Sequence, residues 1–585
     1  MHKQVEQIVI NALKEAVASG ELPLETIPDP ALERPRDRSN GDWATTVAMR
    51  CAKQAHMAPA QIADVVAKHL QGNEWLKSVE VAGPGFINLR LSDAALQGVF
   101  KNVHEQGERF GSSSMGAGTK VDVEFVSANP TGPMHLGHGR WAALGDALSR
   151  VLDFCGYDVT REFYINDAGN QMNVFATSVS CRYLQVASLV AEGKNVTQAC
   201  DCIIANAEHY RAQLPENCYA GAYVVDIAAK IYKDQGAKWV DAPAQEREAA
   251  FLDIAYNAVL NHNKQVLEDF GLVFDVWFSE RTLHATDEQG ASVISKTIDE
   301  LNKLGFIYEK EGATWFRTTD FGDDKDRVLI KADGSYTYFA PDIAYHKNKL
   351  DRGNERCIDL LGADHHGYIK RIQSVGHVFG YPGQPEVIIG QMVNLFRNGE
   401  AVRMSKRTGE MVTFEELIDE VGPDATRYLM LSRSTDQAID FDIAEAVKQD
   451  SSNPVYYVQY AHARICSILR RAAGKDDVSA ADAASLLLQD SCNLACLSDE
   501  AELNLARKID EFGGLVESCA RDLAPFRLTH YAQELAASFH QFYTRCHVLT
   551  DDKDLTSARL YVCDAARIVL ENVLGLLGVS APERM

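Results

Sequence analysis

Two histidines, His135 and His138, stand three positions apart in the segment VDVEFVSANPTGPMHLGHGRWAALGD, which begins at Val121. Imidazole nitrogens donate hydrogen bonds to anions and also bind metals, so the pair by itself is compatible with a phosphate site, half of a metal site or a capped surface loop. No cysteine or carboxylate stands at zinc-ligand spacing nearby. We therefore favour a phosphate site over a metal site.

The residues around the histidines indicate how they are positioned. The β-branched and aromatic run from Val121 to Val126 predicts a strand, and the Pro- and Gly-rich turn after it leads into a helix over 139–155. Apolar residues at three- and four-residue steps give that helix one apolar face: Trp141, Leu144, Leu148 and Leu152. The junction of a strand and a helix N-terminus is where open α/β sheets bind anions, and Gly137 and Gly139 are expected to let a phosphate or ribose approach the backbone.

A second segment, RMSKRTG, covers residues 403–409 and precedes a predicted helix over 414–420. It places Lys406 among small polar residues and glycine. Taken alone, this is a solvated basic loop.

The two segments together resemble the HIGH and KMSKS signatures of class I aminoacyl-tRNA synthetases. The first signature matches residues 135–138 and the second matches residues 403–407. Bacterial arginyl-tRNA synthetases are similar to three longer segments, VEFVSANPTGPMHLGHGR, YFAPDIAYH and GADHHGYIKR. This resemblance extends over nearly the whole chain. Arg403 and Arg407 depart from the second signature but keep or add positive charge.

The resemblance implies that L-arginine is ligated to tRNA(Arg) in two steps. Arginyl-adenylate forms from ATP, with Mg²⁺ held mainly by phosphates and water, and the arginyl group then passes to the 2′-hydroxyl of the terminal adenosine. It assigns catalysis to His135, His138 and Lys406, ATP binding to these residues with Gly137 and Ser405, and arginine binding to Glu124, Asn129, Tyr338 and Asp342. A guanidinium is always charged and offers a planar fork of donors, so the two carboxylates suit it.

Composition limits the class of protein. The chain has 585 residues, 46% of them hydrophobic and 24% charged, which is typical of a globular protein of about four domains. No apolar run of about 18 residues predicts a membrane span, and the N-terminal segment does not resemble a signal peptide. Thirteen cysteines without a C-x-x-C pair favour reduced thiols in the cytoplasm.

The net charge of −24 argues against a protein that binds nucleic acid over its whole surface, because phosphate binding depends on Lys and Arg. A protein that binds tRNA should then gather its basic residues on one docking face. The candidates are the basic clusters Arg34–Arg38 and Arg464–Lys475.

The order of predicted elements indicates an α/β fold with three regions: an N-terminal α+β domain over residues 1–110, a Rossmann-like parallel-sheet catalytic domain over 111–415 with a helical insertion at about 180–265, and an all-α domain over 416–585. Three junctions, HLGH, APDIAYH and GADHH, are expected at strand ends of a single sheet. The third contains Asp364, His365 and His366, whose roles the sequence does not assign.

The resemblance assigns the N-terminal domain to the tRNA elbow and the C-terminal domain to the anticodon. Tyr456, Tyr460 and Arg464 are candidates for stacking on unpaired bases; the alternative is a helical bundle with these tyrosines in its core. Competing functions are a class I synthetase for another amino acid such as cysteine, a non-catalytic synthetase-like tRNA-binding protein, and a small nucleotidyltransferase. The family's usual form is a monomer, and the sequence leaves open whether activation requires bound tRNA.

Overall fold

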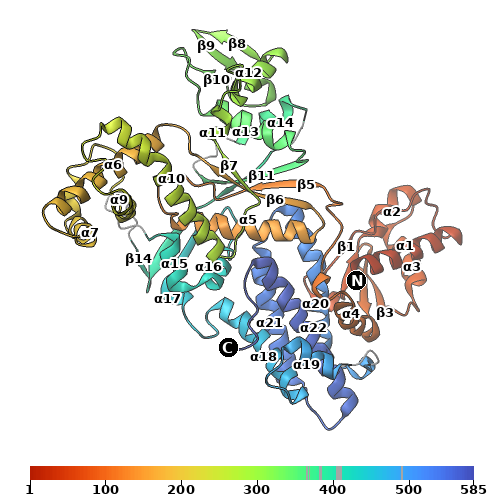
Figure 1. Ribbon diagram of the computed structural model, residues 1–585. Coiled ribbons are helices and arrows are strands. Elements are labelled where there is room, and N and C mark those ends of the chain that lie inside the picture. The colour runs from red at the N-terminus through yellow and green to blue at the C-terminus, as the bar shows by residue number, and fades with distance from the viewer. Residues whose placement is uncertain (364–366, 368, 381–384, 403–411, 489–491) are drawn as a thin grey trace.

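The computed structural model describes residues 1–363, 367, 369–380, 385–402, 412–488 and 492–585 (Figure 1). The resemblance-based site residues Ser405 and Lys406 lie outside these ranges, as do Arg403, Arg407 and the unassigned Asp364, His365 and His366.

A five-stranded parallel sheet forms the centre of the molecule, in the order β12-β11-β5-β6-β7. Its strands are β5 (Lys120–Glu124), β6 (Asp158–Ile165), β7 (Val276–Ser279), β11 (Arg356–Gly362) and β12 (Glu386–Gly390). The predicted Rossmann-like sheet is confirmed. The strand order reverses between β5 and β11, and in such sheets the ligand crevice lies at the carboxyl ends of the strands where the order reverses.

Helix α5 (Leu136–Phe154) follows β5 and is buried on nearly all sides. The prediction of a single apolar face is therefore wrong, because β6 lies on one side and helices from the C-terminal region, α16 (Pro423–Met430), α20 (Glu500–Asp522) and α22 (Lys553–Leu577), lie on the others. Its buried polar residues are all paired: Arg140 donates to the carbonyls of Gln391 at 2.7 Å and Ser434 at 2.9 Å, and Asp146 accepts from Arg427 at 2.7 Å.

Glycines let neighbours approach α5 closely. A Cβ on Gly139 would lie 2.5 Å from the Phe414 ring, and one on Gly145 would lie 2.1 Å from the Phe125 ring. Gly139 therefore makes room for a packed phenylalanine, whereas the sequence had suggested room for a ligand.

A small antiparallel sheet projects from the central one, at the top of Figure 1. It consists of β8 (Ile307–Lys310), β9 (Ala313–Phe316) and β10 (Arg327–Ile330), and packs with α12 (Val293–Lys303), α13 (Phe339–Asp351) and α14 (Ile369–Val378). The strand before the APDIAYH segment is β10, which belongs to this sheet. The expectation that all three polar junctions follow strands of a single sheet is therefore wrong for APDIAYH.

A third sheet, in the order β14-β13-β15, lies near the second signature segment. It contains β13 (Val393–Arg397), β14 (Glu400–Ala401) and β15 (Ile439–Asp442), with α15 (Phe414–Val421) and α17 (Ile443–Ala446) beside it. Residues 403–411 connect β14 to the segment before α15.

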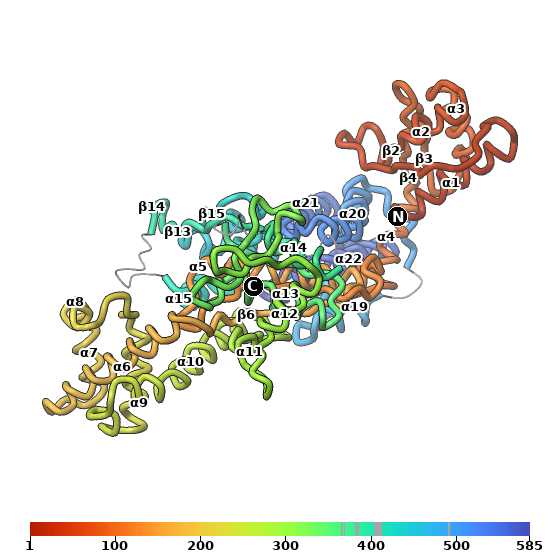
Figure 2. The backbone as a smooth tube through the Cα atoms, turned by 90° about the horizontal axis from the view of Figure 1, so that it is seen from above, coloured from red at the N-terminus to blue at the C-terminus, as the bar shows by residue number. Residues whose placement is uncertain are grey.

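Helices extend from the sheet at the opposite end from the N-terminal region (Figure 2). They are α6 (Asn170–Ala191), α7 (Val196–Ala205), α8 (Ala207–Arg211), α9 (Ala222–Gln235) and α10 (Ala244–Asp269). By length and composition α6 could cross a membrane, but 56% of its most apolar window is buried inside the protein. It packs against α9 and α10, as a core helix does.

The N-terminal region combines an antiparallel sheet of order β1-β2-β4-β3 with four helices. The elements are α1 (His2–Ala18), β1 (Leu32–Glu33), β2 (Trp43–Thr45), α2 (Val47–Ala55), α3 (Pro59–Leu70), β3 (Leu76–Ala82), β4 (Phe86–Leu91) and α4 (Asp93–Gln106). This region packs on α20: Asp42 accepts from Arg507 at 2.6 Å, and Gln97 donates to the Leu497 carbonyl at 2.8 Å.

Several arginines of the two predicted basic clusters form ion pairs within the protein. Arg34 pairs with Asp510 of α20, Arg38 lies 3.9 Å from Glu511, and Arg470 pairs with Glu583 at 2.7 Å. These three arginines thus also contribute to contacts within the protein, and the hypothesis that the two clusters form an RNA-docking face stays a prediction.

The C-terminal region is helical, as predicted, with α18 (Pro454–Ala473), α19 (Ala480–Leu487), α20, α21 (Arg527–Arg545) and α22. All thirteen cysteines of the chain are free thiols.

The contact between Gly145 and Phe125 gives a stability prediction. The substitution Gly145→Ala should destabilise the protein by about 1–3 kcal/mol, because its methyl group overpacks a buried ring. The matched control is Gly98→Ala, at an exposed position of helix α4, where a Cβ would have nothing within 4 Å and alanine should stabilise the protein by up to about 1 kcal/mol. The midpoint of thermal unfolding should fall for the first and not for the second; equal midpoints would contradict the packing argument.

Candidate active site

The two histidines lie in the first turn of α5 and bond to its backbone. The Nδ1 atom of His135 accepts the Gly137 N–H at 3.1 Å, and the Nδ1 atom of His138 accepts the His135 N–H at 3.0 Å. The rings stack with centroids 3.8 Å apart. Because each Nδ1 is an acceptor, the ring proton is on Nε2, so both imidazoles carry an Nε2–H donor at the positive end of the helix dipole.

Gly137 is part of the same arrangement. A Cβ at this position would lie 2.9 Å from Cε1 of His135. The glycine therefore makes room for an imidazole, which is a different reason from the ligand approach that the sequence suggested.

Thr413 and Phe414, which follow the second signature segment in the sequence, contact the residues at the start of the histidine pair. Thr413 forms a β-bridge with His135, and the Phe414 N–H donates to the Met134 carbonyl at 2.9 Å. Lys406 precedes Thr413 by seven positions, a stretch that spans at most about 25 Å when fully extended. Two segments some 270 positions apart in the sequence thus meet at the N-terminus of α5.

The turn from β5 to the histidines contains strained backbone. Val126 and Ser127 have φ angles of 69° and 44°, in the left-handed region that a β-branched residue rarely adopts. Ser127 secures this turn: its Oγ donates to Glu124 at 2.9 Å and accepts the Tyr164 N–H at 3.2 Å. Strain of this kind costs about 1–3 kcal/mol per residue and is concentrated at functional sites.

A buried lysine lies beneath the turn. Lys349 of α13 is fully buried, and its Nζ lies 2.7 Å from Glu124, 2.7 Å from Asp359 and 3.3 Å from Asp122. Burial alone would lower the pKa of Lys349, but these carboxylates raise it well above its usual value. Glu124 thus already has a cationic partner within the protein.

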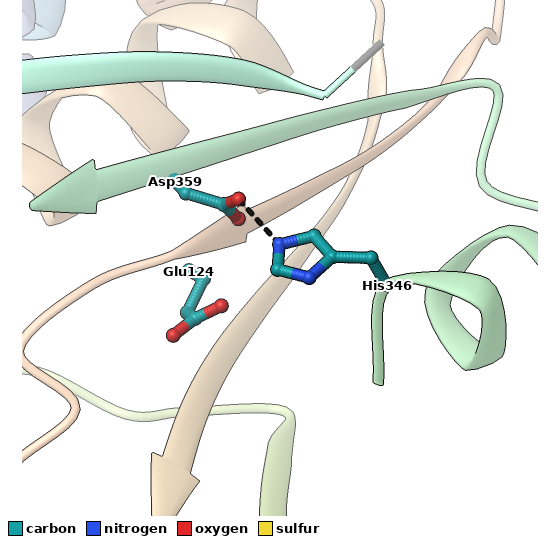
Figure 3. Close-up of side chains that lie close together, drawn as sticks. All are labelled: Glu124, His346 and Asp359. Carbon is teal, nitrogen blue, oxygen red and sulfur yellow. Dashed lines mark hydrogen bonds and ion pairs between the residues drawn. The ribbon is translucent and has the colours of Figure 1, made fainter. Parts of the chain in front are cut away.

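His346 extends the cluster toward Asp342. Its Nε2 lies 2.8 Å from Asp359, as Figure 3 shows, and its Nδ1 lies 2.7 Å from the Asp342 carbonyl. Burial lowers the pKa of His346, but the Asp359 carboxylate outweighs this effect and raises the pKa above its usual value. Within the described ranges, Glu124, His346 and Asp359 are the one group close enough to share a metal ion. The Lys349 ammonium contacts both carboxylates of this group, so these residues do not fit a divalent metal.

Two further carboxyl groups, those of Asp342 and Glu280, lie beside this cluster. Glu280 follows β7, is 8% exposed and bonds to the Tyr164 hydroxyl. Burial, with the nearby charges of Glu280 and Glu124, raises the pKa of Asp342 to about 7, and burial also raises the pKa of Glu280. In the described part of the chain, neither carboxylate forms an ion pair with a lysine or arginine. This corner of the site can accept a cation.

The structure brings only some of the predicted arginine-binding residues together. Glu124 and Asp342 are close enough to interact electrostatically. Tyr338, at the N-terminus of α13, is 83% exposed, and Asn129 is exposed in the turn before the histidines. Sequence reasoning missed Glu280 and Tyr164. Tyr164 lies near the end of β6 and Glu280 directly follows β7, and this position at a strand end is the signal that could have identified them.

The anticodon candidates form a surface stack on α18. Tyr456 and Tyr460 are nearly parallel, at 8°, with centroids 6.1 Å apart, and the Arg464 guanidinium lies 4.7 Å from the Tyr460 ring. Tyr460 is exposed and Tyr456 is half-buried. The alternative, that these tyrosines lie in the core of the bundle, is wrong.

Comparison with known proteins agrees with the fold. Residues 101–194 and 253–467 match the family described as "tRNA synthetases class I (R), catalytic domain", so the parallel sheet with its histidine pair is the catalytic domain of a class I aminoacyl-tRNA synthetase. Residues 3–91 match the "Arginyl tRNA synthetase N terminal domain" and residues 458–585 the "DALR anticodon binding domain". The chain belongs to the arginyl-tRNA synthetase family.

Relatives resemble the chain over its full length. Proteins named arginine–tRNA ligase from Heliobacterium modesticaldum and Moorella thermoacetica are each 44% identical to it, over 100% of this chain and 99% of the relative. The structure of Thermus thermophilus arginyl-tRNA synthetase aligns over 100% of both chains with a TM-score of 0.72 and 21% identity, which shows the same fold.

The buried cluster gives a second stability prediction. Lys349→Met should destabilise the protein by about 3–5 kcal/mol, because Glu124, Asp359 and Asp122 lose their buried counter-ion. The control is Lys347→Met on the same helix, whose pairs with Glu300 and Asp351 are partly exposed and contribute about 0–1 kcal/mol. Urea unfolding of the full chain should separate the two variants; similar losses would show that the cluster is not a net stabilising contact.

Proposed function

We infer that the protein ligates L-arginine to tRNA(Arg) through an arginyl-adenylate intermediate. The observation that carries this proposal is the Asp342–Glu280 pair, two buried or half-buried carboxyl groups next to the crevice that the histidines border. A guanidinium is charged at every physiological pH and offers donors to both carboxylates. A neutral amino-acid side chain would not balance this charge. Among the described residues, the one partner of either carboxylate that can carry a positive charge at hydrogen-bond distance is His284, which lies 3.4 Å from Glu280.

The chemistry requires positioning and charge stabilisation. A carboxylate oxygen of arginine attacks the α-phosphorus of ATP, the bond from this phosphorus to the bridging oxygen breaks, and pyrophosphate leaves. The Nε2–H groups of His135 and His138 stabilise the charge that develops on phosphate oxygens, and Lys406 and Ser405 contact the departing pyrophosphate. Mg²⁺ enters with ATP, held by phosphates and water.

Glu124 and Asp342 contribute to arginine binding in different ways. One of its oxygens bonds to Lys349 and the other to Ser127. It therefore acts mainly through its position and charge, while Asp342 and Glu280 bond to the guanidinium. Tyr338 and Asn129 complete the pocket from exposed positions on either side.

The flanking regions bind the tRNA. Residues 1–110 contact the elbow, and residues 416–585 read the anticodon, where Tyr456, Tyr460 and Arg464 offer stacking faces for unpaired bases. The catalytic domain covers residues 111–415, with its helical insertion at about 180–265. The protein works as a monomer in the cytoplasm.

The proposal is tested by ATP–pyrophosphate exchange with each of the twenty amino acids, with and without tRNA(Arg). Of the twenty amino acids, only arginine should support exchange when tRNA(Arg) is present. Lys406→Ala should slow this exchange by about 10²-fold or more while the protein stays folded. Exchange with a different amino acid would overturn the assignment of substrate. Near-normal exchange by the variant would overturn the role of Lys406.

The raised pKa of Asp342 predicts how arginine binding depends on pH. Below about pH 7 this carboxyl group binds a proton and loses the charge that attracts a guanidinium, so the KM for arginine should rise as the pH falls. Asp342→Asn should raise this KM by roughly 10²-fold, with little change in the KM for ATP, and should weaken the pH dependence. The groups that face Asp342, namely Glu280, Glu124, His346 and Asp359, stay in place in this variant. Equal changes in both KM values would contradict the assignment.

A further inference from the structure

A tyrosine of the helical insertion bonds to the turn that precedes the two histidines. Tyr223 is the second residue of α9, within residues 195–252, which the catalytic-domain match leaves out. Its hydroxyl donates to the Thr131 carbonyl at 2.7 Å. Thr131 belongs to the Pro130–Pro133 turn that leads directly into the histidine pair.

The contact is close and leaves little freedom. A Cβ on Gly132 would lie 2.9 Å from the Tyr223 hydroxyl oxygen, and a Cβ on Gly221 would lie 2.7 Å from the tyrosine ring. Asn263 of α10 donates to the Gly132 carbonyl at 3.3 Å from the same side. Two backbone carbonyls of the turn, those of Thr131 and Gly132, therefore accept hydrogen bonds from helices α9 and α10.

The base of the insertion is itself fixed. The Tyr219 N–H donates to Ser178 Oγ at 2.9 Å, and Arg182 donates to the Ala220 carbonyl at 3.0 Å, so α6 holds the segment that leads to Tyr223. On the far side of the turn, Met134 and His135 are attached to Phe414 and Thr413. The turn thus lies between two anchors, and His135 and His138 follow it.

We propose that Tyr223 is a positioning residue for adenylate formation, which fixes the Pro130–Pro133 turn so that the two histidines meet the phosphates of ATP. The proposal rests on the proposed function, because the histidines must act on ATP. It gives the insertion a role in the first reaction step: a rigid brace for the nucleotide side of the site. The arginine side, built from β7 and α13, does not contact Tyr223 through any hydrogen bond described above.

The test compares Tyr223→Phe with Tyr183→Phe in the full-length enzyme. Tyr183 also lies among these helices, and its hydroxyl donates to the Gly236 carbonyl at 2.6 Å, far in sequence from the turn. Both variants lose one tyrosine-to-carbonyl hydrogen bond, and Tyr183→Phe also loses the bond that its hydroxyl accepts from the Trp239 N–H at 3.3 Å, so the control removes at least as much as the test variant. Arginine-dependent ATP–pyrophosphate exchange is measured for each, with rates normalised to the folded fraction from circular dichroism.

Tyr223→Phe should lower kcat roughly ten- to hundredfold and raise the KM for ATP, because a displacement of about 1 Å at a catalytic group costs up to about 10²-fold. The KM for arginine should not change. Tyr183→Phe should keep wild-type kinetics. If the two variants behave alike, or if Tyr223→Phe changes both KM values equally, the positioning role is overturned while the proposed function stands. These assays contain tRNA(Arg); if the wild-type enzyme shows no arginine-dependent exchange in its presence, the proposed function fails and this inference fails with it.

Discussion

The ammonium group of Lys349 is the interaction on which the site depends. It joins β5, through Glu124 and Asp122, to β11, through Asp359, at the place where the strand order reverses. Removing a lysine from water is costly, and only several carboxylates in contact can repay that cost. The same carboxylates, with Asp342 and Glu280 nearby, leave the site acidic. A buried contact that stabilises the sheet therefore also sets the charge of the substrate pocket.

Helix α5 links this site to the rest of the molecule. Its N-terminus holds the histidines, and its sides are covered by the sheet and by α16, α20 and α22. The buried pair of Asp146 and Arg427 joins the catalytic sheet to the region that follows it, with a distance of 2.7 Å across 281 positions. The N-terminal region rests in turn on α20. The histidines are thus positioned by packing that involves both ends of the chain.

Much of the local structure could be predicted from the sequence. The strand predicted over 121–126 corresponds to β5, and the helices predicted over 139–155 and 414–420 correspond to α5 and α15. The predictions that were wrong concern residues whose surroundings come from distant parts of the chain. The spacing of Trp141, Leu144 and their neighbours suggested one buried face, because spacing within a helix does not show which distant segments pack on it. In the structure α5 is also covered by helices about 290 to 440 positions later. Gly139 suggested space for a ligand because a sequence cannot show that Phe414 fills that space.

The sequence by itself determined the α/β class of the fold and the histidine pair at a helix N-terminus, because these depend on local patterns and on side-chain chemistry. Only the tertiary structure decided which charges meet. It placed Lys349 on Glu124, paired Arg34 with Asp510 and brought Glu280 to Asp342, contacts that link positions 62 to 476 residues apart. Such pairings depend on how whole layers pack, and no local pattern in the chain encodes them.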